Sequence, residues 1–223
     1  MFTIQNLAKG LKSQLILMLF IFAIMFTFSS CEDNDDIVSP SPLTTESYRN
    51  FDNGMHKLWA DHMQWTFATV DAFFNNPGGL QAQLDRLLKN QENIGAAIVP
   101  YYGQAAGDQL TTLLKGHING AVPVLQAAKN NDQTALNQAV ADWRQNAQEI
   151  SDFLSAANPK NWEQSHIRMH MDGHITQTIA YSVDLLQQNY NQAVIDYDLA
   201  FNHMMDFATT LSEGIAKQFP DKF

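Results

Sequence analysis

The chain has 223 residues, of which 13 are lysine or arginine and 23 are aspartate or glutamate, so its formal net charge is −10. Nucleic acid is excluded as a partner for so acidic a chain, and an anionic membrane surface would repel it. The length after about residue 45 suits one domain with a full hydrophobic core.

The first 30 residues are typical of a secretory signal. Lys9 and Lys12 precede an apolar run over 15–28, and no acid occurs in this part of the chain. The run is shorter than the ~20 residues that a spanning helix needs, and Ser29 and Ser30 follow it. A retained transmembrane helix is therefore the less favoured alternative.

The only cysteine, Cys31, stands where the apolar run gives way to acids. This placement resembles the cleavage site of a bacterial lipoprotein, where the cysteine becomes the lipid-bearing first residue of the mature chain. Phe28 departs from that pattern, which usually has leucine or another aliphatic residue there. The resemblance implies a signal peptide over 1–30 and a chain anchored to the envelope through acyl chains such as palmitate. The expected location is the outer membrane, on its periplasmic or cell-surface side.

Residues 31–45 are expected to form a disordered tether. They contain a run of acids followed by alternating serine and proline, with little that a core could bury. A single domain is then expected over 46–223.

Apolar residues recur at spacings of three and four throughout that domain, which predicts an all-α fold. Six helices are expected, over 46–75, 80–98, 104–129, from a cap at Asn131 or Asp132 to before Asn158, 162–187 and 191–217. Pro100 is expected to end the second helix. Short connections favour an antiparallel helical bundle of about six helices with a four-helix core.

Three histidines form the candidate site. His62, His117 and His174 each lie inside the apolar stripe of a different helix, near its middle. Antiparallel helices of similar length place their midpoints at one level, so these imidazoles are expected to share one layer of the interior. Facing helices that supply one imidazole each can hold zinc, copper or iron.

His203 and Asp198 are candidates to complete the metal shell. They are five residues apart on the last helix, so they cannot both point at one centre. His166 and His170 are a less favoured source of ligands, and His56 is expected to be solvated. The alternative is that the interior histidines are ordinary core residues with hydrogen-bond partners.

Other chemistries lack their motifs. No glutamate stands three residues before His62, His117, His174 or His203, which disfavours a ferritin-type di-iron site at these histidines. No Cys-x-x-Cys-His or His-Glu-x-x-His occurs, which disfavours covalent haem and zinc-protease sites. No glycine-rich phosphate loop is present. No catalytic residue is assigned, and an enzyme becomes conceivable only if three ligands leave an open position on the metal.

Several short stretches resemble a family of small helical bacterial proteins. They include Leu58-Trp59-Ala60-Asp61-His62, Pro100-Tyr101-Tyr102-Gly103, Leu113-Leu114-Lys115-Gly116-His117 and Phe153-Leu154-Ser155-Ala156-Ala157-Asn158-Pro159, and the similarity spans most of 55–219. Members carry automatic names such as acetylglutamate kinase or glycosyltransferase, whose α/β nucleotide folds this sequence lacks. The resemblance implies a shared fold and a match at His62, His117 and His174, but no activity.

These observations lead to two expectations of different kinds. The first is a lipid-anchored bundle outside the cytoplasm that binds a transition metal through His62, His117 and His174, with His203 or Asp198 completing the shell. The second is a structural or partner-binding surface lipoprotein with no metal and no catalysis. With Cys31 committed to lipid, a metal site in the domain has no thiolate available.

Overall fold

The computed structural model describes residues 41–223. The predicted signal, Cys31 and the tether up to residue 40 lie outside the described residues. The described residues form one compact unit. The single-turn helix η2 (Pro42–Thr44) leads into it, and a second single turn, η3 (Pro220–Lys222), follows its last long helix.

Six long helices make up this unit. They are α2 (Glu46–Asn75), α3 (Leu80–Tyr102), α4 (Gln104–Lys129), α5 (Gln133–Ala157), α6 (Gln164–Leu186) and α7 (Tyr190–Gln218). No strand occurs within residues 41–223. The predicted all-α bundle of six helices is confirmed. Over the same residues, no helix has both the length and the apolar character needed to cross a membrane.

Side chains and a glycine set the helix ends. Thr45 caps α2 by accepting a hydrogen bond from the Tyr48 N–H at 3.0 Å, and Asp132 caps α5 by accepting one from the Ala135 N–H at 3.0 Å. Each cap satisfies a backbone donor that the first turn of a helix leaves free. Gly103 separates α3 from α4 with a φ of 85°, a conformation that other residues rarely adopt.

The expected end of α3 at Pro100 is wrong, because the helix runs on to Tyr102. Proline lacks one backbone donor, but the last turn still closes through a 2.9 Å bond from the Gly103 N–H to the Val99 carbonyl. The α6 helix begins at Gln164, later than the expected 162. Trp162 is instead buried in the turn before it, where its indole Nε1 donates to the Thr210 carbonyl at 3.1 Å.

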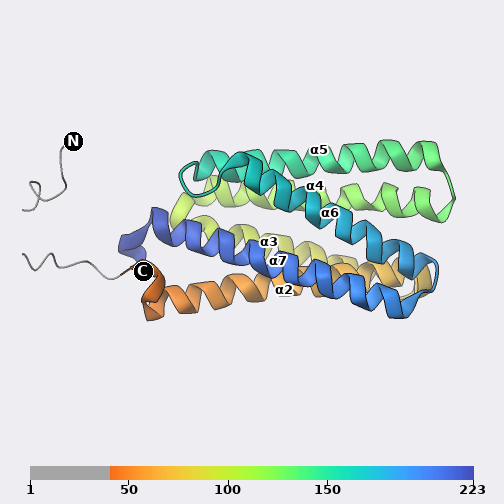
Figure 1. Cartoon of the computed structure of the whole chain (residues 1–223), viewed down its shortest axis with the longest axis horizontal. Coiled ribbons are helices and arrows are strands. Elements are labelled where there is room, and N and C mark those ends of the chain that lie inside the picture. The colour runs from red at the N-terminus through yellow and green to blue at the C-terminus, as the bar shows by residue number, and fades with distance from the viewer. Residues whose placement is uncertain (1–40) are drawn as a thin grey trace, which may run out of the picture. The chain divides into compact units, whose positions relative to one another are not determined.

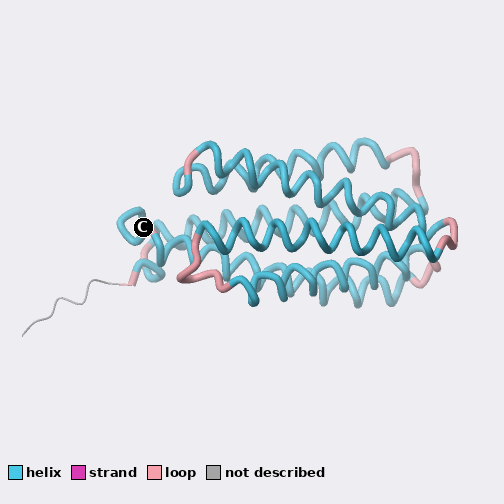
Figure 2. Tube along the Cα trace, turned by 90° about the horizontal axis from the view of Figure 1, so that it is seen from above, coloured by secondary structure: helices cyan, strands magenta, loops and turns pink. Residues whose placement is uncertain are grey.

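Helices that are neighbours in sequence pack against each other, and α2 also packs against α7 (Figure 1). These contacts extend the expected four-helix core to a closed ring of six helices. The connecting loops gather at the two ends of the bundle (Figure 2). Consecutive helices are therefore antiparallel, and α2, α4 and α6 share one direction.

The interior contacts bring these three codirectional helices together. Besides their ring neighbours, α2, α4 and α6 each touch the other two across the bundle. Elsewhere the backbones of α3 and α4 approach closely, since a Cβ on Gly95 would lie 2.6 Å from the Gly107 carbonyl oxygen. This arrangement places the middle of α2, α4 and α6 at one central level, where each helix carries a predicted site histidine.

Candidate metal centre

His62 on α2, His117 on α4 and His174 on α6 meet in the interior of the bundle. Their exposed fractions are only 2%, 3% and 2%. The ring centroids of His62 and His174 are 5.5 Å apart, and those of His117 and His174 are 5.8 Å apart. The structure thus brings together the three histidines that helical periodicity singled out, and they are called the interior cluster below.

The orientation of His117 is held by an amide from α5. His117 Nδ1 lies 2.9 Å from Asn146 Oδ1, and Asn146 Nδ2 donates to the Leu113 carbonyl at 3.2 Å. The second bond fixes which end of the amide faces the ring, so His117 Nδ1 is the donor. His117 Nε2 is then left as a lone-pair nitrogen.

The amide of Gln91 on α3 contacts His62. Gln91 Nε2 lies 3.2 Å from His62 Nδ1, 2.9 Å from the Leu87 carbonyl oxygen and 3.1 Å from Asn90 Oδ1. Its two hydrogens face three acceptors, while Gln91 Oε1 is buried without a partner. The contact at His62 is therefore the less settled of the two amide contacts.

Two fully buried ring nitrogens of the interior cluster have no hydrogen-bond partner. These are His117 Nε2 and His174 Nδ1, and both are buried. Buried polar atoms normally find a partner, and one left unpaired costs about 1–3 kcal/mol. No protein donor or acceptor among the described residues pairs with these two atoms.

Burial keeps the interior cluster neutral. It lowers the pKa of His62 to about 3, with a smaller contribution from His117, and lowers the pKa of His117 to about 4. Burial, followed by the neighbouring His62, also holds the pKa of His174 well below its ordinary value. Neutral imidazole is the form that coordinates metal ions.

A mostly apolar cavity of about 90 Å³ adjoins the interior cluster. The three histidines form part of its wall, and it continues along α2, α4 and α6 toward the C-terminal ends of these helices. α3 and α5 complete the wall with Leu87 and Trp143 among others. The ring of Trp143 lies 5.1 Å from that of His117, and its Nε1 donates to the His117 carbonyl at 2.9 Å.

His203 and Asp198 lie outside the interior cluster. Asp198 is exposed on α7. His203 Nε2 donates to the backbone carbonyl of His170 at 2.8 Å, on the side of α6 where Gly173 lies. The structure therefore does not bring either residue to the three histidines.

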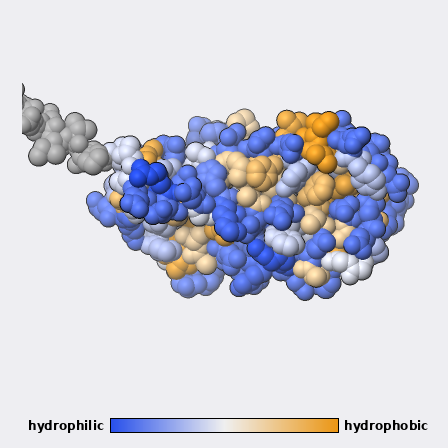
Figure 3. Space-filling view, turned by 90° about the horizontal axis from the view of Figure 1, so that it is seen from below, coloured by the Kyte–Doolittle hydropathy of each residue, from blue (hydrophilic) through white to orange (hydrophobic). Residues whose placement is uncertain are grey.

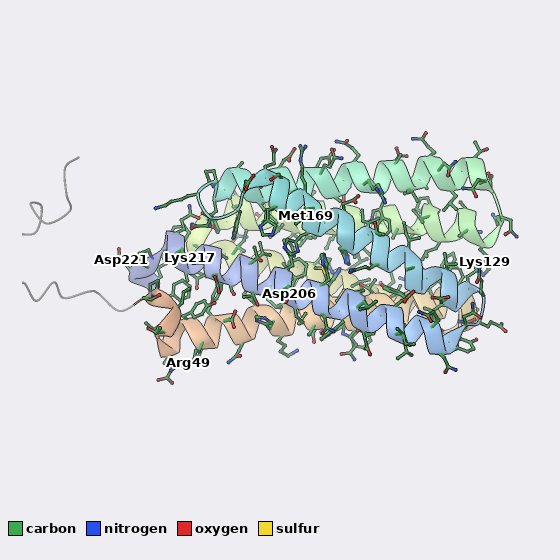
Figure 4. The ribbon with its side chains drawn as sticks, in the orientation of Figure 1. Arg49, Lys129, Met169, Asp206, Lys217 and Asp221 are labelled. Carbon is green, nitrogen blue, oxygen red and sulfur yellow. The ribbon has the colours of Figure 1, made fainter. Side chains whose placement is uncertain are left out.

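His203 belongs instead to a second group, the surface cluster, with His166 and His170. The ring centroids are 4.8 Å apart for His166 and His170 and 5.1 Å apart for His170 and His203. Figure 4 labels Met169 on α6 and Asp206 on α7, the two adjacent helices that carry this cluster. His166 is exposed, and the other two rings are half-buried.

His56 is not simply solvated as expected. It is half-buried, with Nδ1 2.9 Å from the Asp52 carbonyl oxygen and Nε2 3.1 Å from Thr209 Oγ1. It therefore joins α2 to α7, away from the interior cluster.

The first half of α7 exposes several large apolar side chains. Tyr190, Val194, Ile195 and Leu199 are each exposed by half or more. Figure 3 shows how apolar side chains gather in patches on one face of an otherwise largely hydrophilic surface.

Sequence reasoning missed Asn146 and gave Gln91 no role. Gln91 occupies an apolar stripe of its helix, so a fully buried amide at that position was a usable signal. Asn146 lies beside the stripe of α5, and nothing in the spacing indicates its contact with His117.

Across residues 41–223, no group of three or more histidine, cysteine, aspartate or glutamate side chains already has a metal-binding geometry. The three imidazoles of the interior cluster would have to turn their nitrogens toward a common point to share an ion. Comparison of the chain with protein-family models, curated proteins and solved structures found no match.

Proposed function

We propose that this protein is a lipid-anchored, extracytoplasmic helical bundle that binds one transition metal ion through His62, His117 and His174. The observation that carries the proposal is the pair of buried ring nitrogens, His117 Nε2 and His174 Nδ1, that no donor or acceptor satisfies. Both belong to neutral imidazoles that face one another from different helices.

A metal ion would be coordinated by His117 Nε2 and His174 Nδ1, which have no protein partner. Two unpaired buried nitrogens destabilise a plain core, whereas the same lone pairs coordinate an ion. The low proton affinity of the interior cluster helps, because protons compete weakly with the metal for these nitrogens.

The surrounding amides supply the outer contacts that histidine ligands require. A metal-bound imidazole usually donates its other N–H to an oxygen, and Asn146 Oδ1 already accepts from His117 Nδ1. At His62 the same arrangement needs Gln91 to turn its amide over, so that Oε1 faces Nδ1. The buried, unpartnered Oε1 of Gln91 is available for that role.

The ligand set favours zinc, copper or iron. Imidazole suits all three ions, and the sole cysteine, Cys31, is assigned to the lipid in this proposal. Three histidines leave a coordination position open. The proposal concerns binding of the metal and includes no catalytic step.

The test is the metal content of residues 40–223, which form a compact unit, purified without a tag. Elemental analysis after incubation with zinc, copper or iron should find about one equivalent per chain and a raised melting temperature, because a ligand of the folded state stabilises it. Less than ~0.1 equivalent together with an unchanged melting temperature would overturn the proposal.

His117→Ala separates a metal centre from a plain core. The variant should lose metal uptake, whereas in a structural lipoprotein it would only change packing. His166→Ala is the matched control, since it removes an exposed histidine of the surface cluster. Equal uptake by the His117→Ala variant and the unchanged protein would contradict the assignment of ligands.

A further inference from the structure

The cavity beside the interior cluster has apolar walls along most of its length. Val70, Ile118, Leu125 and Leu186 are among the residues that line it. Hydroxyl groups also line it, but those of Thr66 and Ser182 donate to carbonyls of their own helices, at 2.7 Å to His62 O and 2.6 Å to Thr178 O. These donors are committed within their helices, so the wall offers little to a polar ligand.

One end of the cavity differs from the rest. His117 Nε2, His174 Nδ1 and Thr178 Oγ1 belong to lining residues, and all three atoms are buried without a partner. Thr178 lies one turn after His174 on α6, so both residues belong to the same face of that helix. A ligand that fits must therefore present one small polar group there and remain apolar elsewhere.

The cavity reaches the surface between α4 and α6. Val122 on α4 and Val183 on α6 line it, yet they are 40% and 38% exposed. Figure 1 shows α6 crossing the bundle obliquely from the end of α5 toward the start of α7. These two valines mark the side on which the cavity approaches solvent.

The size of the cavity selects a slender ligand. Its volume is about 90 Å³, smaller than the ~150 Å³ of an apolar cavity known to accept benzene. A flat ring is therefore disfavoured, while an unbranched hydrocarbon chain can follow a narrow space and extend out of its mouth. Small-molecule sites are mostly apolar with a few convergent polar groups, and this cavity has that composition.

The polar group that fits the inner end is a neutral hydroxyl. A hydroxyl can donate to the lone pair of His117 Nε2 and accept from Thr178 Oγ1. No lysine or arginine lines the cavity, so no ammonium or guanidinium group is available there to pair with a carboxylate. Burying an uncompensated carboxylate is costly, so a fatty acid is a poorer ligand than the corresponding alcohol.

We propose that this cavity binds a straight-chain aliphatic alcohol, with its chain between α2, α4 and α6 and its hydroxyl group at His117 and Thr178. The site extends beyond the proposed metal centre and can be measured on metal-free protein. Each methylene group that enters the cavity should improve affinity roughly fourfold, until the chain fills the space.

The experiment is calorimetric titration of residues 40–223, stripped of metal with EDTA, with 1-butanol, 1-hexanol and 1-octanol. Affinity should rise along the series, while benzyl alcohol and hexanoate should each bind at least tenfold more weakly than 1-hexanol at pH 7. No heat of binding from any alcohol would overturn the proposal. Hexanoate or benzyl alcohol binding as tightly as 1-hexanol would overturn it as well.

Two substitutions test the location. Ala121→Leu and Ala128→Leu each add a side chain to the cavity wall, and should weaken 1-octanol binding at least tenfold. Ala141→Leu makes the same change at an exposed position of α5 and should leave binding unchanged. Melting temperatures identify the folded variants, and one folded cavity variant that binds 1-octanol normally overturns the assignment.

The two proposals can be tested independently, because metal uptake and alcohol binding are measured in separate experiments. A chain that takes up metal but binds no alcohol overturns this proposal alone. A chain that binds alcohols but takes up no metal overturns the metal centre alone. Thr178→Val should weaken 1-hexanol binding by removing the hydroxyl contact, without removing any of the three histidines, and unchanged affinity would contradict the placement of the head group.

Discussion

The interior cluster and the surface cluster contain the same kind of side chain in different surroundings. The rings of His166, His170 and His203 are closer together, at 4.8 and 5.1 Å, than the 5.5 and 5.8 Å found between the interior rings. In the surface cluster His203 Nε2 bonds a backbone carbonyl and His166 is exposed to water, while His170 Nδ1 is buried without a partner. The interior cluster differs because all three of its rings are buried.

The two clusters also differ in the number of helices that supply their rings. The surface cluster takes two histidines from one turn of α6, a spacing visible in the sequence. The interior cluster takes one histidine from each of three helices, so its geometry depends on the whole bundle. A change in either cluster therefore tests a different level of structure.

The largest expected difference is the response of stability to pH. The interior histidines have pKa values far below 6.5 in the folded metal-free protein, about 3 for His62 and about 4 for His117. As pH falls below about 6.5, these histidines bind protons in the unfolded chain but stay neutral in the folded protein. The free energy of unfolding therefore decreases. Each interior histidine should remove about 2 kcal/mol of stability between pH 7 and pH 5.

Urea unfolding of metal-free protein at pH 7, 6 and 5 measures this effect. Replacing one interior histidine, as in His174→Leu, should remove the contribution of that residue and leave the rest of the pH slope. Part of the remainder comes from His170, because burial lowers its pKa to about 4. A free energy of unfolding that stays constant from pH 7 to pH 5 would show that the interior cluster is not held neutral by burial.

Asn146→Ala should have the next largest effect, on metal affinity. The change removes the oxygen that accepts from His117 Nδ1 at 2.9 Å, so the ring is no longer held with Nε2 free. Loss of such an outer contact lowers metal affinity by roughly 10–100-fold. Competition with a metal indicator measures the dissociation constant.

Gln145→Ala is the matched control for Asn146→Ala. It removes an amide from the neighbouring, exposed position of α5, where Gln145 Nε2 donates to Glu149 Oε1 at 3.3 Å. Its metal affinity should equal that of the unchanged protein. If both variants bind the metal equally well, the Asn146 contact has no role in orienting the ligand.

The sequence predicts that the three interior histidines share one layer of the bundle. It does not predict that His203 lies in the surface cluster. Helical periodicity places His62, His117 and His174 on inward faces near mid-helix. Antiparallel packing then brings the midpoints of their helices to one level. The position of His203 depends on how α7 is rotated against α6, where the missing side chain of Gly173 leaves room for its ring. A Cβ there would lie 3.1 Å from that ring. Such a contact between two helices has no counterpart in the spacing of either.

The helix boundaries also divide into those that local sequence predicts and those that it does not. The caps at Thr45 and Asp132 follow from local side-chain chemistry, and the predicted starts of α2 and α5 agree with the structure. The continuation of α3 past Pro100 depends on Gly103 closing the last turn. Local rules therefore place the starts of these helices better than the end of α3.

His174→Leu should have a smaller effect, and in the stabilising direction. In metal-free protein the change removes the buried, unpartnered Nδ1 from the core. Removing that cost should raise the free energy of unfolding at pH 7 by about 1 kcal/mol, while metal uptake is lost. Urea unfolding and elemental analysis measure the two effects. A variant that is less stable than the unchanged metal-free protein would mean that His174 has a stabilising partner.

His166→Ala should have the smallest effect. The side chain is exposed, and its ring contacts only the neighbouring His170 among the aromatic rings of the described residues. Surface substitutions of this kind change the free energy of unfolding by no more than about 0.5 kcal/mol. Metal uptake should remain near one equivalent, because the three buried ligands are intact. A fall in uptake on His166→Ala, with His117→Ala unaffected, would reverse the comparison and transfer the metal site from the interior of the bundle to the α6–α7 surface.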